Sequence, residues 1–592
     1  MKSETRRKIL SAAMAVMASM AVWAHMEASS HEIVLLIAAV GLYRLFHASF
    51  ECDGRRGAVT SAITGLLFAV FMVLGKLNAL SETKGYTLWL LIRFLGFWAL
   101  FYAVLRVLFS KLSGVRLFED DISDRTPDKC RRVFFLSLLA FCAWFFLWWL
   151  YEYPGNTFPD TNNQLMQALG LRKLSSDHPA LSTLCLGGVF KLGLRLFSDD
   201  QNAAFALCMA VQSVIMASVF AYVTESLYEF GAKKRTVFIA ACIYIIIPVY
   251  ASNSVAGLKD VLFSGFITLF CTTLWRMLRK SDIGAKICST EIVLLYISAL
   301  LAGLFRNKSY YAFLILTPIL PFAFKRGSIW IKIAAPVVFC AALLIDGPVY
   351  ASFDIQHSDL IETYSVPAQH IARVIYDGHE LSDAEYKLLS KAVDIERVPT
   401  TYMPTVSDPI KALIRETGDG TYIEEHSSEY LRLWLKLGMR YPGAYLRAQI
   451  DQTLGYWYPD VSYWTMGNYC EPSDTLTIYK DRKAPAFIIS AFDEIGFYMT
   501  KLPLIGLAFS IGTAVWIMLS AFALCIVRKQ YRTMAVFVPP LLLWLTLLAV
   551  TPVFAEFRYI FPMYTVLPLL CVIPLCGGEN NTAVQNKSNA AS

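Results

Sequence analysis

The chain has 592 residues, of which 56% are hydrophobic, 14% are aromatic and only 17% are charged. A soluble chain of this length would carry far more charge on the surfaces of several domains. Here, apolar runs of roughly 17–25 residues recur from one end to the other, which is the length needed to cross about 30 Å of hydrocarbon. The composition therefore excludes an ordinary soluble protein and predicts an all-α polytopic membrane protein.

The net charge of +7 and the 13 cysteines do not change this interpretation. In a membrane protein the excess of Lys and Arg belongs mainly to cytoplasmic loops, so it indicates no nucleic-acid partner. The cysteines are scattered, mostly within apolar runs, and predict no disulfide framework. The basic start MKSETRRK precedes an apolar run that we interpret as an uncleaved first helix, with the N-terminus in the cytoplasm.

Four apolar runs precede a basic loop. They lie at about residues 9–25, 32–49, 58–77 and 87–108. The loop from Lys111 to Arg132 is rich in basic residues, and the positive-inside rule places it in the cytoplasm. A fifth run at about 133–151 then leads outward, so the polar loop at 152–179 is predicted to be extracytoplasmic.

The next run, at 180–197, is long enough to span but is interrupted by Lys191 and Arg195. If it crossed the bilayer, the following span would leave the basic triplet at 233–235 on the outer face, against the positive-inside rule. We therefore interpret 180–197 as an interfacial helix, with its apolar side in lipid and its basic residues at the head groups.

The remaining apolar runs bring the total to about fourteen spans, with both termini cytoplasmic. They lie at about 203–228, 236–252, 258–278, 289–305, 309–325, 329–347, 502–526, 533–552 and 559–576. The stretch 348–497 has the composition of a soluble protein and is predicted to be a mostly helical extracytoplasmic domain.

The chain thus divides into five parts in a multi-pass protein of the plasma (cytoplasmic) membrane. They are N-terminal helices with a cytoplasmic loop (1–132), a transmembrane core (133–347), the extracytoplasmic domain (348–497), C-terminal spans (498–576) and a cytoplasmic tail predicted to be disordered (577–592).

The loop 152–179 holds the first candidate for chemistry, Asp160. Pro159 disfavours helix before it. A partly desolvated carboxylate at the bilayer surface can take a proton from an acceptor hydroxyl or hold a divalent metal. The alternative is that Asp160 caps the helical sequence TNNQLMQALG. Gln164 and Gln167 share one face of that helix and are candidates for binding sugar hydroxyls, although exposed Gln usually has no specific role.

Asp177 and His178 precede Pro179, which suits the first turn of the following helix. His178 is a candidate for contacting a phosphate or a sugar, and Asp177 belongs to the same predicted site. The alternative for His178 is an ordinary helix cap or surface residue.

Further candidates fall at the predicted outer ends of distant spans. They are Lys259, Asp260, Arg306, Lys308, Glu556, Arg558 and Tyr559. Ionisable groups at membrane depth are costly, which favours a functional interpretation, and basic groups there suit an anionic head group. The alternatives are an ion pair between Lys259 and Asp260 and an ordinary interfacial role for Tyr559. Together these residues would supply cations for a leaving phosphate and a carboxylate for an incoming nucleophile.

At these residues the chain resembles the GT-C superfamily of membrane glycosyltransferases that use polyprenyl-phosphate-linked sugars. The resemblance lies in Pro159-Asp160, in His178-Pro179, which is similar to the His-Pro-Pro of protein O-mannosyltransferases, and in Lys259-Asp260. It covers roughly 130–350 and 500–576. The segments YPGNTFPD, SDHP, RNKSYY and EFRYIFP are also similar to a poorly characterised bacterial family of such proteins.

The resemblance implies a GT-C-like core, inverting sugar transfer and Asp160 as catalytic base or metal ligand. This chain departs from the superfamily in having Thr161 after Asp160 instead of a second acid, His-Pro-Ala for His-Pro-Pro, four extra spans before the core, and the domain at 348–497. A divalent metal is a possible cofactor; none is certain.

The leading hypothesis is therefore transfer of a sugar from a polyprenyl-phosphate donor to an envelope glycan, lipid or protein on the extracytoplasmic face. Asp160 would activate the acceptor hydroxyl, and Arg306 and Arg558 would hold the donor phosphate. The alternatives are a transporter or flippase of lipid-linked saccharides, which predicts ionisable residues along a path through the bilayer, and a non-catalytic envelope scaffold.

Overall fold

A computed structural model describes residues 2–26, 32–77, 86–119, 121–325, 327–356, 360–461, 463–499, 501–502 and 505–576. Within these residues the chain is helical, with isolated β-bridges but no strand. The predicted disordered tail, 577–592, lies outside the described residues. The all-helical class predicted from the sequence is confirmed.

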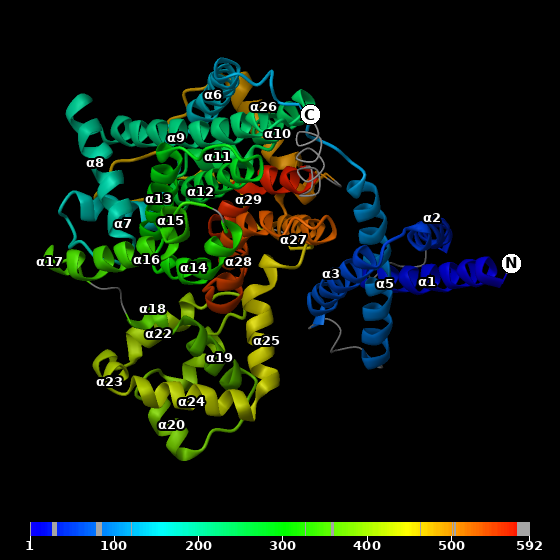
Figure 1. Ribbon diagram of the computed structural model, residues 1–592. Helices are drawn as coiled ribbons and strands as arrows, with labels where there is room; N and C mark the ends of the chain where they lie inside the picture. The colour runs from blue at the N-terminus through cyan, green and yellow to red at the C-terminus, as the bar shows by residue number, and fades with distance from the viewer. Residues whose placement is uncertain are drawn as a thin grey trace.

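The helices form three groups along the chain (Figure 1). The N-terminal group comprises α1 (Lys2–Met26), α2 (Glu32–Glu51), α3 (Arg55–Leu74) and α5 (Tyr86–Ser113). The central group comprises α6 (Pro127–Tyr151), α7 (Pro159–Ala168), α8 (Ala180–Leu196), α9 (Gln201–Glu229), α10 (Lys234–Ile246), α11 (Val249–Ser254), α12 (Lys259–Asp282), α13 (Ser289–Leu304), α14 (Ala312–Ala323), α15 (Ile329–Lys332), α16 (Ala334–Leu344), α17 (Tyr350–Ser352), α26 (Ala486–Met499), α27 (Ile511–Val527), α28 (Val538–Val550) and α29 (Phe557–Val572).

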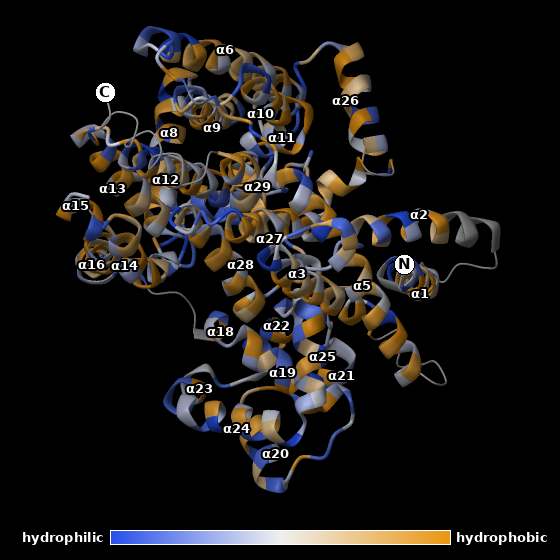
Figure 2. Cartoon of the chain, turned by 45° about the vertical axis from the view of Figure 1, so that its right-hand side comes forward, coloured by the Kyte–Doolittle hydropathy of each residue, from blue (hydrophilic) through white to orange (hydrophobic). Residues whose placement is uncertain are grey.

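The third group is a lobe of short helices drawn below the others in Figure 1. It comprises α18 (Leu360–Thr363), α19 (Ser365–Tyr376), α20 (Asp383–Leu389), α21 (Val398–Thr401), α22 (Asp408–Thr417), α23 (Gly420–Glu425), α24 (Ser427–Arg440) and α25 (Pro442–Thr453). Hydrophilic residues are concentrated in this lobe and hydrophobic ones in the long helices (Figure 2). We call residues 360–453 the outer lobe, because they lie outside the group of long helices.

Nine described helical segments are long and apolar enough to cross a membrane. They are Glu4–His25, Arg55–Leu74, Thr87–Ser113, Pro127–Tyr151, Gln201–Glu229, Lys259–Asp282, Ala334–Ser352, Thr533–Val550 and Phe557–Leu575. Three more apolar helices have 10–17 residues. The multi-pass class is thus supported, whereas the predicted total of about fourteen spans stays a prediction.

The span predicted at 236–252 is broken in the structure. Helix α10 ends at Ile246 and the short helix α11 begins at Val249, with Pro248 between them. Proline cannot donate a backbone hydrogen bond, and it disfavours helical geometry in the residue before it, which accounts for the break. The predicted interfacial segment is a helix, α8, which packs on α7 and α9.

Helices α12 and α29 of the central group pack together, and their first turns lie close to each other. Helix α12 packs along α29, and the Thr268 hydroxyl donates a hydrogen bond of 2.7 Å to Thr565 Oγ1 between them. Lys259 and Asp260 form the first turn of α12, and Arg558 lies in the first turn of α29. Packing of the two helices therefore brings together charged residues that are 298 positions apart in the sequence.

Two connecting segments are held together by backbone pairing. Asn156 donates from its backbone N–H to Val255 O at 2.9 Å, and its carbonyl accepts from Gly257 N at 2.8 Å. The Thr161 hydroxyl donates to Gly257 O at 2.8 Å. This pairing joins the segment that ends in Asp160 to the segment that ends in Lys259.

The range 348–497, predicted as one extracytoplasmic domain, is divided in the structure. The outer lobe has a hydrophobic core of its own, built around Val398, Ile410 and Leu437. In contrast, Tyr456, Trp457 and Tyr458 join the large core of the long helices. The residues after them return to the loop between α6 and α7, where the Glu471 N–H donates to Thr157 O at 3.2 Å.

We predict that Gly257→Ala lowers the thermal stability of the detergent-solubilised protein. A Cβ atom at Gly257 would lie 2.7 Å from Thr161 Cγ2 and 2.8 Å from Phe205 Cζ. Overpacking of this kind costs about 1–3 kcal/mol. The matched control is Gly188→Ala on α8, where a Cβ atom meets nothing within 4 Å. An equal or higher melting temperature for the Gly257 variant would contradict the pairing described above.

Candidate active site

Asp160 lies in the first turn of α7, after Pro159 at the first helical position. The helix begins after Phe158, so Asp160 is not the N-cap residue, and the alternative interpretation from the sequence is wrong. The Thr161 hydroxyl instead accepts a hydrogen bond from the Phe158 N–H at 3.1 Å. An acidic side chain in the first turn is favourable because backbone N–H groups give that end of the helix a partial positive charge.

Three basic side chains from three other segments surround the Asp160 carboxylate. Arg558 Nη1 donates to Asp160 Oδ2 at 2.6 Å. Lys259 Nζ lies 3.6 Å from the same oxygen and His178 Nδ1 lies 4.0 Å from it. Lys259 Nζ also lies 2.9 Å from His178 Nδ1. We call Asp160, His178, Lys259 and Arg558 the Asp160 cluster.

The Asp160 cluster is half-buried and still open to solvent. The exposed fractions of the Asp160, Arg558, Lys259 and His178 side chains are 26%, 20%, 15% and 12%. This degree of burial strengthens electrostatic interactions without closing the site to a ligand.

A second group of charged residues lies directly beside the first. Arg306 Nη1 lies 3.3 Å from Asp260 Oδ1, and its guanidinium lies 5.1 Å from the Tyr559 ring centroid. The Arg558 guanidinium lies 5.1 Å from the same ring, and its Nε lies 3.4 Å from Glu556 Oε1. Arg558 therefore belongs to both groups and connects two carboxylates.

The protonation states follow from these contacts. Burial would raise the pKa of Asp160, but the positive charges of Lys259 and Arg558 outweigh it and hold the pKa well below the usual range of a carboxyl. Burial and the neighbouring Lys259 ammonium lower the pKa of His178 to about 4. At neutral pH, Asp160 is therefore ionised and His178 is neutral, and His178 Nδ1 accepts a hydrogen bond from the Lys259 ammonium.

Glu556 differs from Asp160 in its environment. Burial raises the pKa of this carboxyl, and the pull of Arg558 does not fully offset that effect. Tyr463 donates to Glu556 Oε2 at 3.3 Å. The pKa values of the two acids that contact Arg558 are thus shifted in opposite directions, downward for Asp160 and upward for Glu556.

Four of the predicted site residues take other partners. Gln164 Nε2 donates to the hydroxyls of Ser182 at 2.8 Å and Thr183 at 3.0 Å, and Gln167 Nε2 donates to Ser175 Oγ at 3.3 Å. These amides connect α7 to neighbouring segments and do not join the Asp160 cluster.

Asp177 accepts from the Ser175 hydroxyl at 3.0 Å, and Lys308 lies 3.3 Å from Asp346. A substrate-binding role for either residue, as for Gln164 and Gln167, stays a prediction.

The sequence analysis missed the residues of the returning segment. The Trp464 ring stacks on Phe158 with centroids 5.8 Å apart, two residues before Asp160. Lys480 donates to the backbone carbonyls of Glu152 at 2.8 Å and Gly155 at 3.0 Å. The aromatic run YWYPDVSYW is visible in the sequence, but nothing in it indicates that it folds back onto loop 152–179.

The residues around Asp160 do not fit a divalent cation. Its three close neighbours are basic, and two of them carry positive charge that would repel a metal. Across the described part of the chain, no three His, Cys, Asp or Glu side chains are grouped so that they could share a metal ion.

The comparison with known families gives one match. No curated protein and no solved structure matches the chain. Residues 171–589 match a family described as "Family of unknown function (DUF6020)", a segment that includes His178, Lys259, Arg306 and Arg558 and begins after Asp160. Because this segment covers more than half of the sequence, the chain belongs to that family.

Proposed function

We propose that the protein is a membrane glycosyltransferase whose active site is the Asp160 cluster. It would transfer a sugar from a polyprenyl-phosphate donor to a cell-envelope acceptor on the extracytoplasmic face of the plasma membrane. The observation that supports this proposal is the ionised carboxylate of Asp160 in contact with Arg558, beside Lys259 and a neutral His178. Such a site has cations for a phosphate and a base for a hydroxyl.

In the proposed reaction, the acceptor hydroxyl oxygen attacks the anomeric carbon of the donor. The bond from that carbon to the phosphate oxygen breaks, and the phosphate leaves with the electron pair. The hydroxyl proton passes to Asp160. Arg558 and Lys259 stabilise the negative charge that develops on the leaving phosphate. Attack on the face opposite the phosphate inverts the configuration, as the GT-C resemblance implies.

Donor binding would also activate the base. In the structure described here, Arg558 and Lys259 lower the pKa of Asp160, and a carboxylate of such low pKa is a weak base. A donor phosphate would compete with Asp160 for the same two cations. Their attraction for the carboxylate would then weaken, and the pKa of Asp160 would rise only when the donor is in place.

The distribution of charges along α12 favours transfer over transport. Helix α12 carries Lys259 and Asp260 in its first turn and Arg276, Arg279 and Lys280 near its end. Between them, from Val261 to Trp275, it has no ionisable side chain other than the buried Cys271. A path for a charged saccharide would require ionisable groups along the span.

We predict that Asp160→Asn abolishes most sugar transfer from labelled polyprenyl-phosphate sugar by the purified protein. Loss of a general base lowers the rate about 10²–10⁴-fold. The matched control is Asp199→Asn, an exposed acid in a left-handed backbone conformation that Asn also adopts readily. Transfer at the native rate by a folded Asp160 variant would refute the assignment.

We predict that Arg558→Gln and Lys259→Gln weaken binding of the product, polyprenyl phosphate, by about 10–100-fold each. A hydrogen bond to a charged group contributes about 1.5–3 kcal/mol. Lys173→Gln is the control, since this lysine is exposed in the same loop as Asp160. Equal affinity of all three variants, measured with labelled lipid in detergent, would show that the phosphate binds elsewhere.

The pH profile should separate the free protein from the donor complex. The acid limb of kcat/KM reports the free protein, in which Asp160 stays ionised well below the usual carboxyl range. The acid limb of kcat reports the donor complex, in which competition for the cations raises the pKa of Asp160. We therefore expect kcat to fall at a higher pH than kcat/KM as the medium is acidified. Superimposable limbs would contradict competition between donor and Asp160.

A further inference from the structure

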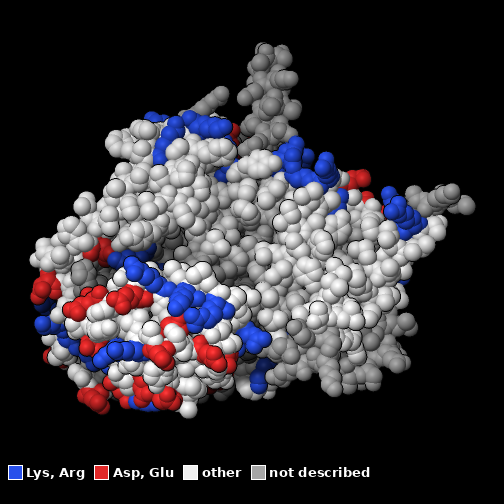
Figure 3. All heavy atoms as spheres, turned by 90° about the horizontal axis from the view of Figure 1, so that it is seen from below, with Lys and Arg blue, Asp and Glu red and all other residues white. Residues whose placement is uncertain are grey.

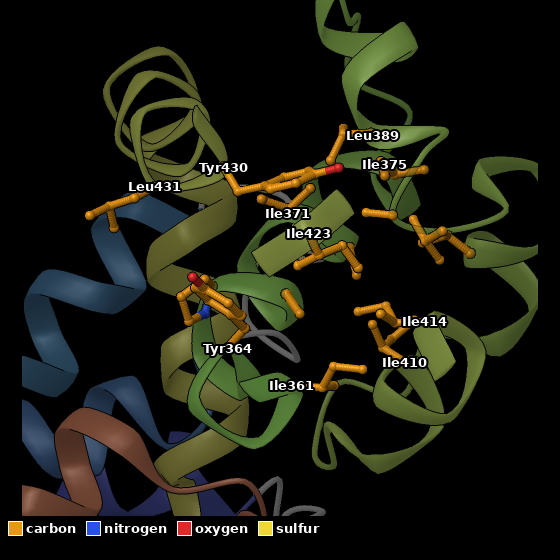
Figure 4. A pocket seen from close by; sticks show the side chains of 16 residues that line it. Ile361, Tyr364, Ile371, Ile375, Leu389, Ile410, Ile414, Ile423, Tyr430 and Leu431 are labelled. Atoms are coloured by element: carbon orange, nitrogen blue, oxygen red, sulfur yellow. The ribbon is translucent and has the colours of Figure 1, made fainter. Parts of the chain in front are cut away.

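The outer lobe contains a cavity of about 80 Å³ whose lining is aliphatic and aromatic. Figure 4 shows Ile361, Ile371, Ile410, Ile414 and Ile423 directed toward this space, and they come from four helices, α18, α19, α22 and α23. The Tyr430 hydroxyl, which also borders it, donates to Leu388 O at 3.0 Å. The cavity therefore offers a ligand mainly dispersion contacts.

An empty space of this kind is costly in a protein interior. Cores are packed as densely as organic crystals, and a cavity loses the contacts that its lining would otherwise make. Several residues that line the cavity are small, including Ala368, Ala372 and Ala392. Larger side chains at these positions would fill it. Water gains little there because an apolar cavity gives it no hydrogen bonds.

The cavity continues into an exposed apolar stripe. Leu431 borders the cavity and is 47% exposed, and Leu435 and Met439 follow it at intervals of four residues along α24. Residues four apart share one face of a helix, so these side chains form one strip. The opposite side of α24 is also apolar, with Leu433 and Leu437 buried in the core of the lobe.

This strip lies in a lobe that is otherwise rich in charge. Figure 3 shows Lys, Arg, Asp and Glu crowded over one region of the visible face, beside a broad surface with few charges. The lobe is connected to a candidate span, because Ile361 lies nine positions after Ser352, the last residue of the span Ala334–Ser352. Nine extended residues reach about 30 Å at most, so Ile361 at the cavity lies within that distance of the end of a candidate membrane helix.

We propose that this cavity binds the terminal segment of one hydrocarbon chain of a bilayer lipid, which enters along Leu431. The apolar lining accepts hydrocarbon and leaves the polar head group outside, at the charged surface of the lobe. The proposal goes beyond sugar transfer and does not depend on it. It makes the outer lobe a lipid-binding module.

The test uses the full-length protein in liposomes that contain a fatty acid with a photoreactive diazirine at the end of its chain. After illumination, mass spectrometry of the peptides should find labels on α19 and α22, which contribute Ile371 and Ile410 to the cavity. Labels on the lipid-facing spans serve as the internal reference. Labels on the spans alone, with none on α19 or α22, would overturn the proposal.

Two variants fill the cavity, so that a folding failure of one leaves the test intact. Ala368→Phe and Ala392→Leu place bulk among the lining residues, whereas Ser390→Phe adds bulk at an exposed position of the same lobe. Labelling of α19 and α22 relative to the spans should fall about tenfold in a folded filled variant, because the chain and the new side chain cannot occupy one space. Native labelling in both folded variants would contradict a chain inside the cavity.

Discussion

The contact between Asp160 and Arg558 is the interaction on which the candidate site depends. It joins the start of α7 to the start of α29 across 398 residues of sequence, at 2.6 Å. Lys259 at the start of α12 stabilises the same carboxylate. Because a half-buried acid is costly without compensating charge, the packing of α12 against α29 is also a condition for an ionised Asp160. The fold and the electrostatics of the site therefore cannot be separated.

The loops around this contact are held by backbone pairing and by the returning segment. Asn156 pairs with the segment before Lys259, and Trp464 covers Phe158 beside Asp160. The site is thus built from several helices and loops that are far apart in the sequence, and no single element of secondary structure carries it. Such a construction fixes a carboxylate and its cations in place before a ligand arrives, which is what electrostatic stabilisation of a leaving group requires.

Much of this arrangement could be predicted because the membrane limits where charge can lie. Lys259 and Arg558 are predicted from their positions at the ends of apolar runs, and Asp160 and His178 from the polar loop that follows such a run. All four positions are predicted to lie at the same depth. Depth could not determine which residues pair. Arg306, expected at the donor phosphate, contacts Asp260, while Gln164 turns toward Ser182. The fold of 454–484 depends on long-range contacts that leave no periodic pattern, and the break at Pro248 was hidden within an apolar run.

The central claim is that a donor phosphate takes the cations that now hold Asp160. The most direct measurement is a cryo-electron microscopy structure of the protein with polyprenyl phosphate in a lipid nanodisc. The account predicts phosphate density within hydrogen-bonding distance of Arg558 and Lys259, with Asp160 separated from Arg558. Phosphate density elsewhere, or an Arg558–Asp160 contact that persists beside a bound phosphate, would contradict it.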